Sequence, residues 1–354
     1  MLWNGCRQPD FGKLQSIQIG WGGLCQPDEG VRMNKLARFA VVMAVCGCGV
    51  GLAQQGVPAE KAQPAQAPAQ AQTKVWPPPP ETTVAADPAI WRVKGAHGTV
   101  YLFGSVHVMK PNVKWESDKV TAALAASDVL YLEIANLDDT TGAEPMVMQF
   151  GIDVQHPLST KISKDDLALL EGAAKGMGLP GEQMFEPMRP WLVSLTLSVA
   201  PMLRAGYQPT SGIDLKLLAE VKAEQKPVKG FETMLEQMHM LADVPQAEQV
   251  KMLHKDLVEL DKSTAEMNDI VVAWEHGDVE KIGKMDNDEL ATKYPEEYKR
   301  IVVDRNRRWA ATIDGLLKDP ATGTVFVAVG AAHLAGPDSV LKMLEKDGYV
   351  VVRE

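Results

Sequence analysis

Cysteine is scarce in this chain and confined to its front. The four cysteines are Cys6, Cys25, Cys46 and Cys48, so everything after position 48 is free of cysteine. That larger part can form no disulfide, no zinc–thiolate site and no cysteine nucleophile. This excludes enzymes that depend on a cysteine nucleophile or on a zinc–thiolate site after position 48.

Positive charge is also in short supply. The 354 residues include 36 Lys and Arg against 46 Asp and Glu, a formal net charge of −10. Without the first 53 residues, 31 basic and 43 acidic residues leave −12. Nucleic acids and anionic membranes are bound through clustered positive charge, so we expect neither as a partner.

One apolar stretch near the front is too short to span a membrane. Phe39–Leu52 has about 14 residues, fewer than the roughly 20 that a spanning helix needs. It follows Met33, Lys35 and Arg38 and ends beside Ala53, the pattern of a secretory signal peptide. We therefore predict Met33 as the true start, residues 1–53 as a mis-called start plus signal peptide, and a periplasmic or secreted protein.

Two cysteines within this stretch allow a second interpretation, in which one of them carries a lipid anchor. Val45-Cys46-Gly47-Cys48 resembles a bacterial lipoprotein box, so Cys48 or Cys46 is an alternative site of lipidation and the only membrane contact we expect. Residues 54–87 are rich in Ala, Gln and Pro, a composition typical of an extended linker. The folded domain is expected over residues 88–354.

Two segments far apart in the chain share one pattern. TVYLFGSVH at Thr99–His107 and TVFVAVGAAH at Thr324–His333 each place a Gly-x-x-His after a nearly continuous apolar run. Such runs favour strands covered on both faces of a largely parallel sheet. The histidines then lie just past the carboxyl ends of strands, where open α/β sheets bind ligands. We predict His107 and His333 as two halves of one site.

The remaining pattern predicts the architecture. A hairpin partner at Ala89–Val93, a strand at Val129–Ile134 and a closing strand–helix–strand unit over 325–352 come from the two ends of the chain. The middle is mostly helical apart from a short strand at Pro227–Phe231. The fold class is therefore α/β, a central mixed, largely parallel β-sheet with a large helical insertion as a cap over about 160–318.

Several charged residues join the histidines as candidates. Glu133 lies near the end of a strand, where a buried carboxylate is costly unless paired, protonated or metal-bound; the alternative is an edge-strand residue facing water. Asp214 is either a site residue or an ordinary helix-initiating acid. Glu232 follows a short strand. Within Arg305–Trp309, either all arginines lie on a solvated helix face or one faces the site.

These motifs together resemble a known family, the TraB/PrgY/GumN proteins, which include the Tiki metalloproteases. The resemblance covers Ala89–Glu354, is closest to the bacterial GumN-like branch, and implies a Tiki/ChaN/erythromycin-esterase-like fold. The segments that carry it are IWRV, TVYLFGSVH, VLYLEI, SGIDLKLL, KGFET with Glu236-Gln237 after it, RNRRWA and VFVAVGAAHLAGPDSVLKML.

The resemblance also implies a chemistry. In the Tiki branch, the motif histidines and a strand glutamate are implicated in divalent-metal-dependent peptide hydrolysis. By position the metal ligands here are His107, His333 and Glu133, with Mn or Co favoured and Zn or Fe as alternatives. The other matching family positions are Asp214, Glu232, Arg305 and Asn306.

Two hypotheses follow for the function. In the first, a metal lowers the pKa of a bound water, Glu232 or Asp214 is the general base, and Arg305 is an oxyanion clamp, so that a peptide or protein is hydrolysed. The chain lacks a His-Glu-x-x-His helix, so distant strands would assemble this site. In the second, a non-catalytic periplasmic regulatory protein binds a peptide or haem-like ligand. In a third interpretation, both histidines only form hydrogen bonds at the strand ends and stabilise the core. The substrate and oligomeric state stay open.

Overall fold

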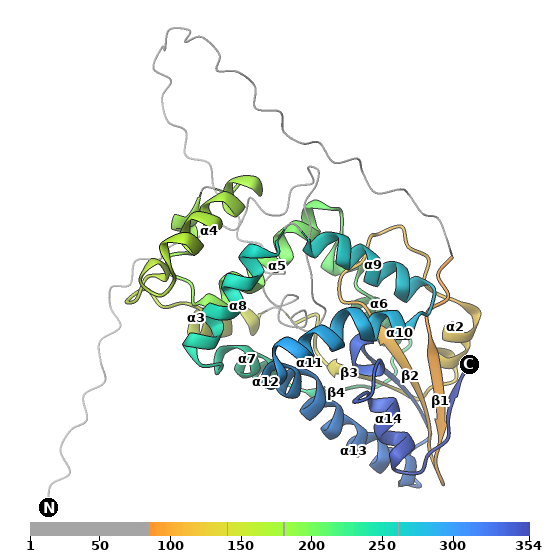
Figure 1. Ribbon diagram of the computed structural model, residues 1–354. Helices are drawn as coiled ribbons and strands as arrows, with labels where there is room; N and C mark the ends of the chain where they lie inside the picture. The colour runs from red at the N-terminus through yellow and green to blue at the C-terminus, as the bar shows by residue number, and fades with distance from the viewer. Residues whose placement is uncertain (1–84, 140, 180, 261) are drawn as a thin grey trace, which may run out of the picture.

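The computed structural model describes residues 85–139, 141–179, 181–260 and 262–354 (Figure 1). The expectations for the signal peptide, for Cys46 and Cys48, and for nearly all of the linker lie outside the described residues. A six-stranded sheet has the order β4-β3-β5-β2-β1-β6. Its strands are β1 (Ile90–Lys94), β2 (Thr99–Ser105), β3 (Val129–Ile134), β4 (Val228–Glu232), β5 (Thr324–Gly330) and β6 (Val351–Arg353).

The sheet is mixed and largely parallel, as the sequence predicts. Strands β4, β3, β5 and β2 are parallel neighbours, whereas β1 is antiparallel to both β2 and β6. The register pairs Ser105 with Gly330, so β2 and β5 end level with each other. The segments that carry His107 and His333 therefore begin at the same edge of the sheet.

Helices fill most of the chain between β3 and β5 (Figure 1). The α-helices are α2 (Asp118–Ala125), α3 (Ala143–Gly151), α4 (Lys164–Gly176), α5 (Pro190–Arg204), α6 (Ile213–Ala223), α7 (Met234–Ala242), α8 (Gln246–Val258), α9 (Ser263–Glu275), α10 (Val279–Ile282), α11 (Glu289–Lys293), α12 (Pro295–Tyr298), α13 (Asp304–Lys318) and α14 (Val340–Lys346). Short 3-10 turns are η2 (Leu158–Thr160), η3 (Glu182–Phe185), η4 (Pro209–Ser211) and η7 (Ala331–Leu334), and π-type turns are η5 (Gly283–Asp288) and η6 (Lys299–Val303).

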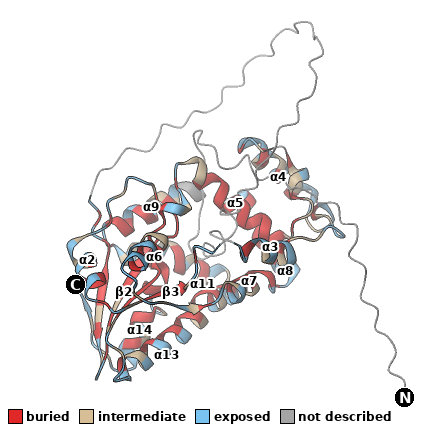
Figure 2. Ribbon diagram, turned by 180° about the vertical axis from the view of Figure 1, so that it is seen from behind, coloured by how far each residue is buried: buried red, intermediate tan, exposed pale blue. Residues whose placement is uncertain are grey.

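Apolar side chains cover both faces of the sheet, which explains the continuous apolar runs of β2 and β5. On one face Leu102 and Val327 pack with Trp309 of α13 and Leu344 of α14. On the other face, residues such as Phe326 join the larger core that includes α5, α6 and α9. Figure 2 shows α5 and the central strands β2 and β3 as largely buried, whereas α13 has both buried and exposed residues. Burial on both faces removes the need for alternating polar residues.

Helix α5 is the most enclosed helix of the cap. Every residue from Pro190 to Met202 is buried, which matches a sequence that is apolar around the whole helix. Pro190 stands in the first helical turn, where its missing N–H leaves no hydrogen bond unmade. Of the helices in the described part of the chain, none is long and apolar enough to cross a membrane.

Candidate functional site

The two predicted histidines meet at one edge of the sheet. His107 lies just beyond β2, and His333 lies in η7 directly after β5; they are 6% and 3% exposed. The strand ends approach closely, because a Cβ on Gly104 would lie 3.0 Å from Cα of Ala331. A larger residue at position 104 would separate the segments.

His107 is held by a carboxylate from a distant helix. Its Nδ1 lies 2.6 Å from Oδ2 of Asp214, in the first turn of α6, and Oγ of Ser105 donates to Oδ1 of Asp214 at 2.5 Å. Since an ionised carboxylate only accepts, Nδ1 of His107 donates. Burial opposes the charged imidazole, but the charge and hydrogen bond of Asp214 prevail and raise the pKa of His107 to about 9.

His333 has the opposite protonation state. Its Nε2 lies 3.0 Å from Nη1 of Arg305, and its Nδ1 lies 2.6 Å from Oδ1 of Asn306. A guanidinium can only donate, so Nε2 accepts and Nδ1 carries the proton given to Asn306. Burial and the charge of Arg305 lower the pKa of His333 to about 3. The ring also packs against Trp309, with centroids 4.5 Å apart.

Glu133 lies beside His107, shares Arg305 with His333 and does not face water. It is 4% exposed, and its Oε1 accepts from the backbone N–H of Gly330 at 2.8 Å and lies 3.8 Å from Nε2 of His107. Its Oε2 accepts from Nη2 of Arg305 at 2.5 Å and from Nε2 of Gln237 at 3.1 Å. Burial acts to raise the pKa of Glu133, but the charges of Arg305, His107 and His333 and the hydrogen bond from Gly330 together outweigh burial and lower it.

Arg305 is the arginine that faces the site. Its Nε lies 3.1 and 3.0 Å from the two carboxylate oxygens of Glu232, so one buried guanidinium joins Glu232, Glu133 and His333. Arg307 and Arg308 have side chains that are 66% and 59% exposed, although Arg308 still reaches Glu232 at 2.9 Å. The solvated-face interpretation is therefore wrong for Arg305 alone.

All seven sequence candidates lie in this connected cluster. Asn306 links it to the chain beyond β5, since its Nδ2 donates to the backbone oxygen of Asp338 at 2.7 Å. Sequence reasoning did not select Ser105 and Gln237 as site residues. A polar residue that ends a nearly continuous apolar run was a usable signal for Ser105, and Gln237 stood in a segment that carries the family resemblance but was given no role.

A divalent metal does not fit the site while Arg305 holds its present position. No three His, Cys, Asp or Glu side chains within the described ranges are arranged to hold a metal ion. His107 and Glu133 form a pair of potential ligands, but the guanidinium contacts both Nε2 of His333 and Oε2 of Glu133. Gly330 lets the site residues approach the strand end closely, because a Cβ there would lie only 3.2 Å from Oε1 of Glu133.

The fold and site thus define an α/β protein with a buried histidine, carboxylate and arginine cluster built from two Gly-x-x-His segments. The chain belongs to the TraB/PrgY/gumN family, whose sequence model matches residues 89–353. This confirms the resemblance found in the sequence.

Individual relatives are distant. An uncharacterized protein of Treponema pallidum is 24% identical over 72% of this chain and 80% of its own length. The uncharacterized protein YbaP of Escherichia coli is 25% identical over 69% of this chain and 87% of its own length. The metalloprotease TIKI1 of Danio rerio is 23% identical over 74% of this chain but only 62% of its own length. No solved structure matches significantly.

Proposed function

We propose that this protein hydrolyses peptide bonds at the cluster formed by His107, His333, Glu133 and Arg305. The observation that carries the proposal is that two buried imidazoles near one carboxylate have opposite partners: Nδ1 of His107 donates to Asp214, whereas Nε2 of His333 accepts from Arg305. These partners raise the pKa of His107 and lower that of His333. Titratable neighbours whose pKa values are pushed apart are typical of acid–base catalysis. The choice of peptide bonds is supported by distant relatives that are named metalloproteases.

The geometry suggests a role for each charged group. As water adds to the carbonyl carbon and the C–N bond breaks, protonated His107 is suited to donate a proton to the departing amine and to regain one from the added water. Arg305 is suited to stabilise negative charge on the attacked carbonyl oxygen once it releases one of its present acceptors. Each oxygen of Asp214 and Glu232 already accepts a hydrogen bond. This favours positioning of His107 by Asp214, and of Arg305 by Glu232, over direct proton transfer by either carboxylate.

We further propose a divalent metal as cofactor, with Mn²⁺ or Co²⁺ ahead of Zn²⁺ or Fe²⁺. Imidazole and carboxylate ligands suit all four ions, and the candidate ligands are His107, His333 and Glu133. As a ligand His107 would have to be neutral at Nε2, so its role as a ligand and its role as a proton donor are alternatives. Arg305 would first have to release His333 and Glu133.

The cellular setting is a separate part of the proposal. The signal-peptide pattern at Met33–Ala53 supports export to the periplasm or beyond, where peptides or proteins would be the substrates. N-terminal sequencing of the exported protein tests this, and a mature chain that still begins before Met33 would refute it.

The decisive experiment combines metal analysis with turnover. The protein, purified without chelator, is assayed on a peptide library with added Mn²⁺ or Co²⁺, beside His107→Ala and His333→Ala. His156→Ala is the matched control, because its side chain is 70% exposed and contacts only Asp153 among the ion pairs found. Cleavage and bound metal in the wild type and control, both lost in the two site variants, are expected.

Two results would contradict the proposal. If His107→Ala still cleaves peptides, the cluster does not catalyse the cleavage. Saturable binding of an intact peptide, with no cleavage under any metal, would instead support the non-catalytic periplasmic binding protein.

A further inference from the structure

The turn that carries His333 is held from outside by one side-chain amide. Nδ2 of Asn287 lies 2.8 Å from the backbone oxygen of Ala332 and 3.0 Å from that of Ala335. A primary amide has two N–H groups, so Asn287 donates to both oxygens. Ala332 and Ala335 stand on either side of His333, so the amide joins the two ends of η7. Asn287 is 2% exposed, which leaves water little access to either hydrogen bond.

Asn287 reaches this turn from an unusual element. It belongs to η5, a π-type turn, and such turns are rare and frequently occur at functional sites. The backbone of η5 packs directly against the end of η7, because a Cβ on Gly283 would lie 3.3 Å from the backbone nitrogen of Gly336 and 3.4 Å from Cβ of Ala335. The amide of Asn287 is therefore carried by a segment that is itself in contact with the turn.

Two supports fix the imidazole of His333. From α13, Asn306 accepts from its Nδ1 at 2.6 Å, and Arg305 donates to its Nε2 at 3.0 Å. From η5, Asn287 fixes the backbone from which the ring extends. The direction of a side chain depends on its backbone, so a shift of η7 moves Nε2 of His333 relative to Arg305. Catalytic side chains have to stay within about 0.5 Å of their productive position.

The first Gly-x-x-His segment has a comparable support. Nε1 of Trp274, in α9, donates to the backbone oxygen of Gly104 at 2.6 Å, and this indole is also 2% exposed. Each of the two segments therefore receives a buried side-chain hydrogen bond on its backbone from the helical insertion. In the second segment, the accepting oxygens flank the histidine itself.

We propose that Asn287 is a positioning residue for the reaction, whose amide fixes η7 so that Nε2 of His333 faces Arg305. The inference rests on the proposed peptide hydrolysis and adds a residue to it. Asn287 touches no substrate and acts only through His333. It lies in none of the segments that carry the family resemblance.

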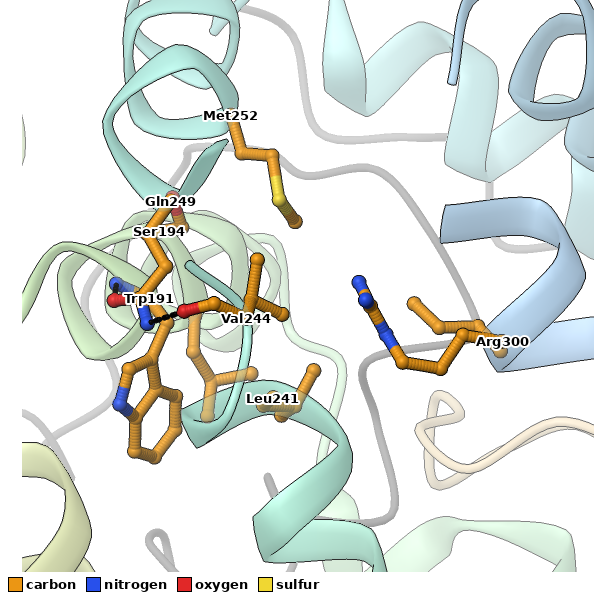
Figure 3. Close-up of a pocket in the computed structure, with 9 residues that line it drawn as sticks. Trp191, Ser194, Leu241, Val244, Gln249, Met252 and Arg300 are labelled. Atoms are coloured by element: carbon orange, nitrogen blue, oxygen red, sulfur yellow. Dashed lines mark hydrogen bonds between the residues drawn. The ribbon is translucent and has the colours of Figure 1, made fainter. Parts of the chain in front are cut away.

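Gln249 of α8 provides a matched control. It too is a buried amide that bridges two backbone oxygens, since its Nε2 donates to that of Ala242 at 3.3 Å and to that of Val244 at 2.7 Å, and it is 1% exposed. Figure 3 shows its hydrogen bonds with Trp191 and Val244 in the cap. These partners lie outside the histidine cluster. Gln249→Ala thus removes the same type of bond as Asn287→Ala without touching η7.

The test uses metal-free protein labelled with ¹⁵N at histidine, as wild type, Asn287→Ala, Asn287→Ser and Gln249→Ala. The imidazole NMR signals are assigned with His107→Ala and His333→Ala. Asn287→Ala should shift the Nδ1–H and Nε2 signals of His333 and change those of His107 less, whereas Gln249→Ala should keep the wild-type signals of both rings. Asn287→Ser keeps one O–H donor, should shift the same signals by less, and replaces the alanine variant if that one does not fold.

Peptide cleavage gives a second readout. Asn287→Ala should lower kcat roughly 10-fold to 100-fold with little change in KM, because the misplaced group acts in the reaction and not in binding. Gln249→Ala should leave kcat close to that of the wild type.

Three results would overturn the proposal: unchanged His333 signals in Asn287→Ala, equal changes in Gln249→Ala, or a raised KM with unchanged kcat. Equal changes would show a general loosening of the cap. The NMR result does not depend on turnover, so shifted His333 signals in a protein that cleaves no peptide refute the proposed hydrolysis alone. Cleavage by the wild type with unshifted His333 signals in Asn287→Ala refutes the positioning role alone.

Discussion

His107 Nδ1 lies 2.6 Å from Oδ2 of Asp214, although 107 positions separate the two residues. The contact joins the end of β2 to the first turn of α6. It sets the orientation of the imidazole, so that Nε2 is directed toward Glu133. A ring whose other nitrogen is held by a carboxylate keeps one tautomer and one direction, which is what a proton donor or a metal ligand requires.

This contact predicts a pH dependence of stability. The pKa of about 9 for folded His107 lies above the ordinary value of 6.5, so charged His107 contributes its full stability below about pH 6.5 and loses it as pH rises through about 9. The loss is of the order of 3 kcal/mol in the free energy of unfolding. Urea unfolding in metal-free buffer between about pH 6 and about pH 9.5 measures it.

The matched variant for this prediction is Asp214→Asn. Without the carboxylate the pKa of His107 is no longer raised, and most of the alkaline decrease in unfolding free energy should disappear. His276→Gln, at an exposed histidine, should keep the wild-type decrease. If the unfolding free energy of Asp214→Asn falls with pH as steeply as that of the wild type, Asp214 does not hold the proton on His107.

Gly330→Ala should separate activity from folding. The added methyl would lie 3.2 Å from Oε1 of Glu133, a tight contact, 3.4 Å from Nε2 of His107 and 3.6 Å from Cδ2 of His333, while φ at this position is an ordinary −49°. We expect unfolding free energy to change by less than about 1 kcal/mol and peptide cleavage to fall at least about tenfold. Gly315→Ala, where nothing lies within 4 Å, should leave cleavage unchanged.

Removing Arg305 should show whether its guanidinium and a metal ion compete for the same side chains. Arg305→Met leaves Glu133 and Glu232 without their buried cation, and we expect a loss of about 3–5 kcal/mol in unfolding free energy. Added Mn²⁺ or Co²⁺ should recover part of this loss, because both carboxylates and His333 are then open to an ion. Thermal unfolding with and without the metal measures the recovery.

The control for that measurement is Arg308→Met, since Arg308 contacts the same Glu232 from an exposed position. Its stability should change by less than about 1 kcal/mol. If the metal raises the melting temperature of the wild type as much as that of Arg305→Met, Arg305 does not compete with it.

Gly212→Ala should disturb the site through the backbone. A Cβ at this position would lie 2.2 Å from the backbone oxygen of His107 and 2.9 Å from that of Pro209, and neither can move without shifting its segment. We expect a destabilisation of about 1–3 kcal/mol or more, together with an altered His107 NMR signal. Gly172→Ala in α4 has no atom within 4 Å and should be neutral or slightly stabilising. If Gly212→Ala and Gly172→Ala have equal free energies of unfolding, the close contact at Gly212 is contradicted.

Part of the site could be predicted because it depends on strand ends. The apolar runs of β2 and β5 predict burial on both faces, and the Gly-x-x-His after each places the histidines at one edge. Their pairing in register, Ser105 with Gly330, is what brings the two together. Glu133 was found for a related reason, since a carboxylate on a buried strand needs a partner.

The choice among the arginines could not be made as directly. Arg305, Arg307 and Arg308 are chemically equal in sequence, and only the packing of α13 buries the first and exposes the others. The four-residue spacing from Arg305 to Trp309 was a usable signal, because residues four apart share a helix face and a tryptophan tends to be buried.

The sequence by itself determined the family, the largely parallel sheet and the identity of the residues at the strand ends. These follow from local apolar patterns and from short motifs, which act through neighbouring positions in the chain. The tertiary structure alone decided that a guanidinium occupies the centre of the site and that the two histidines have opposite partners. Charge and protonation inside a protein depend on burial and on partners brought together from distant segments, and no local pattern contains those distances.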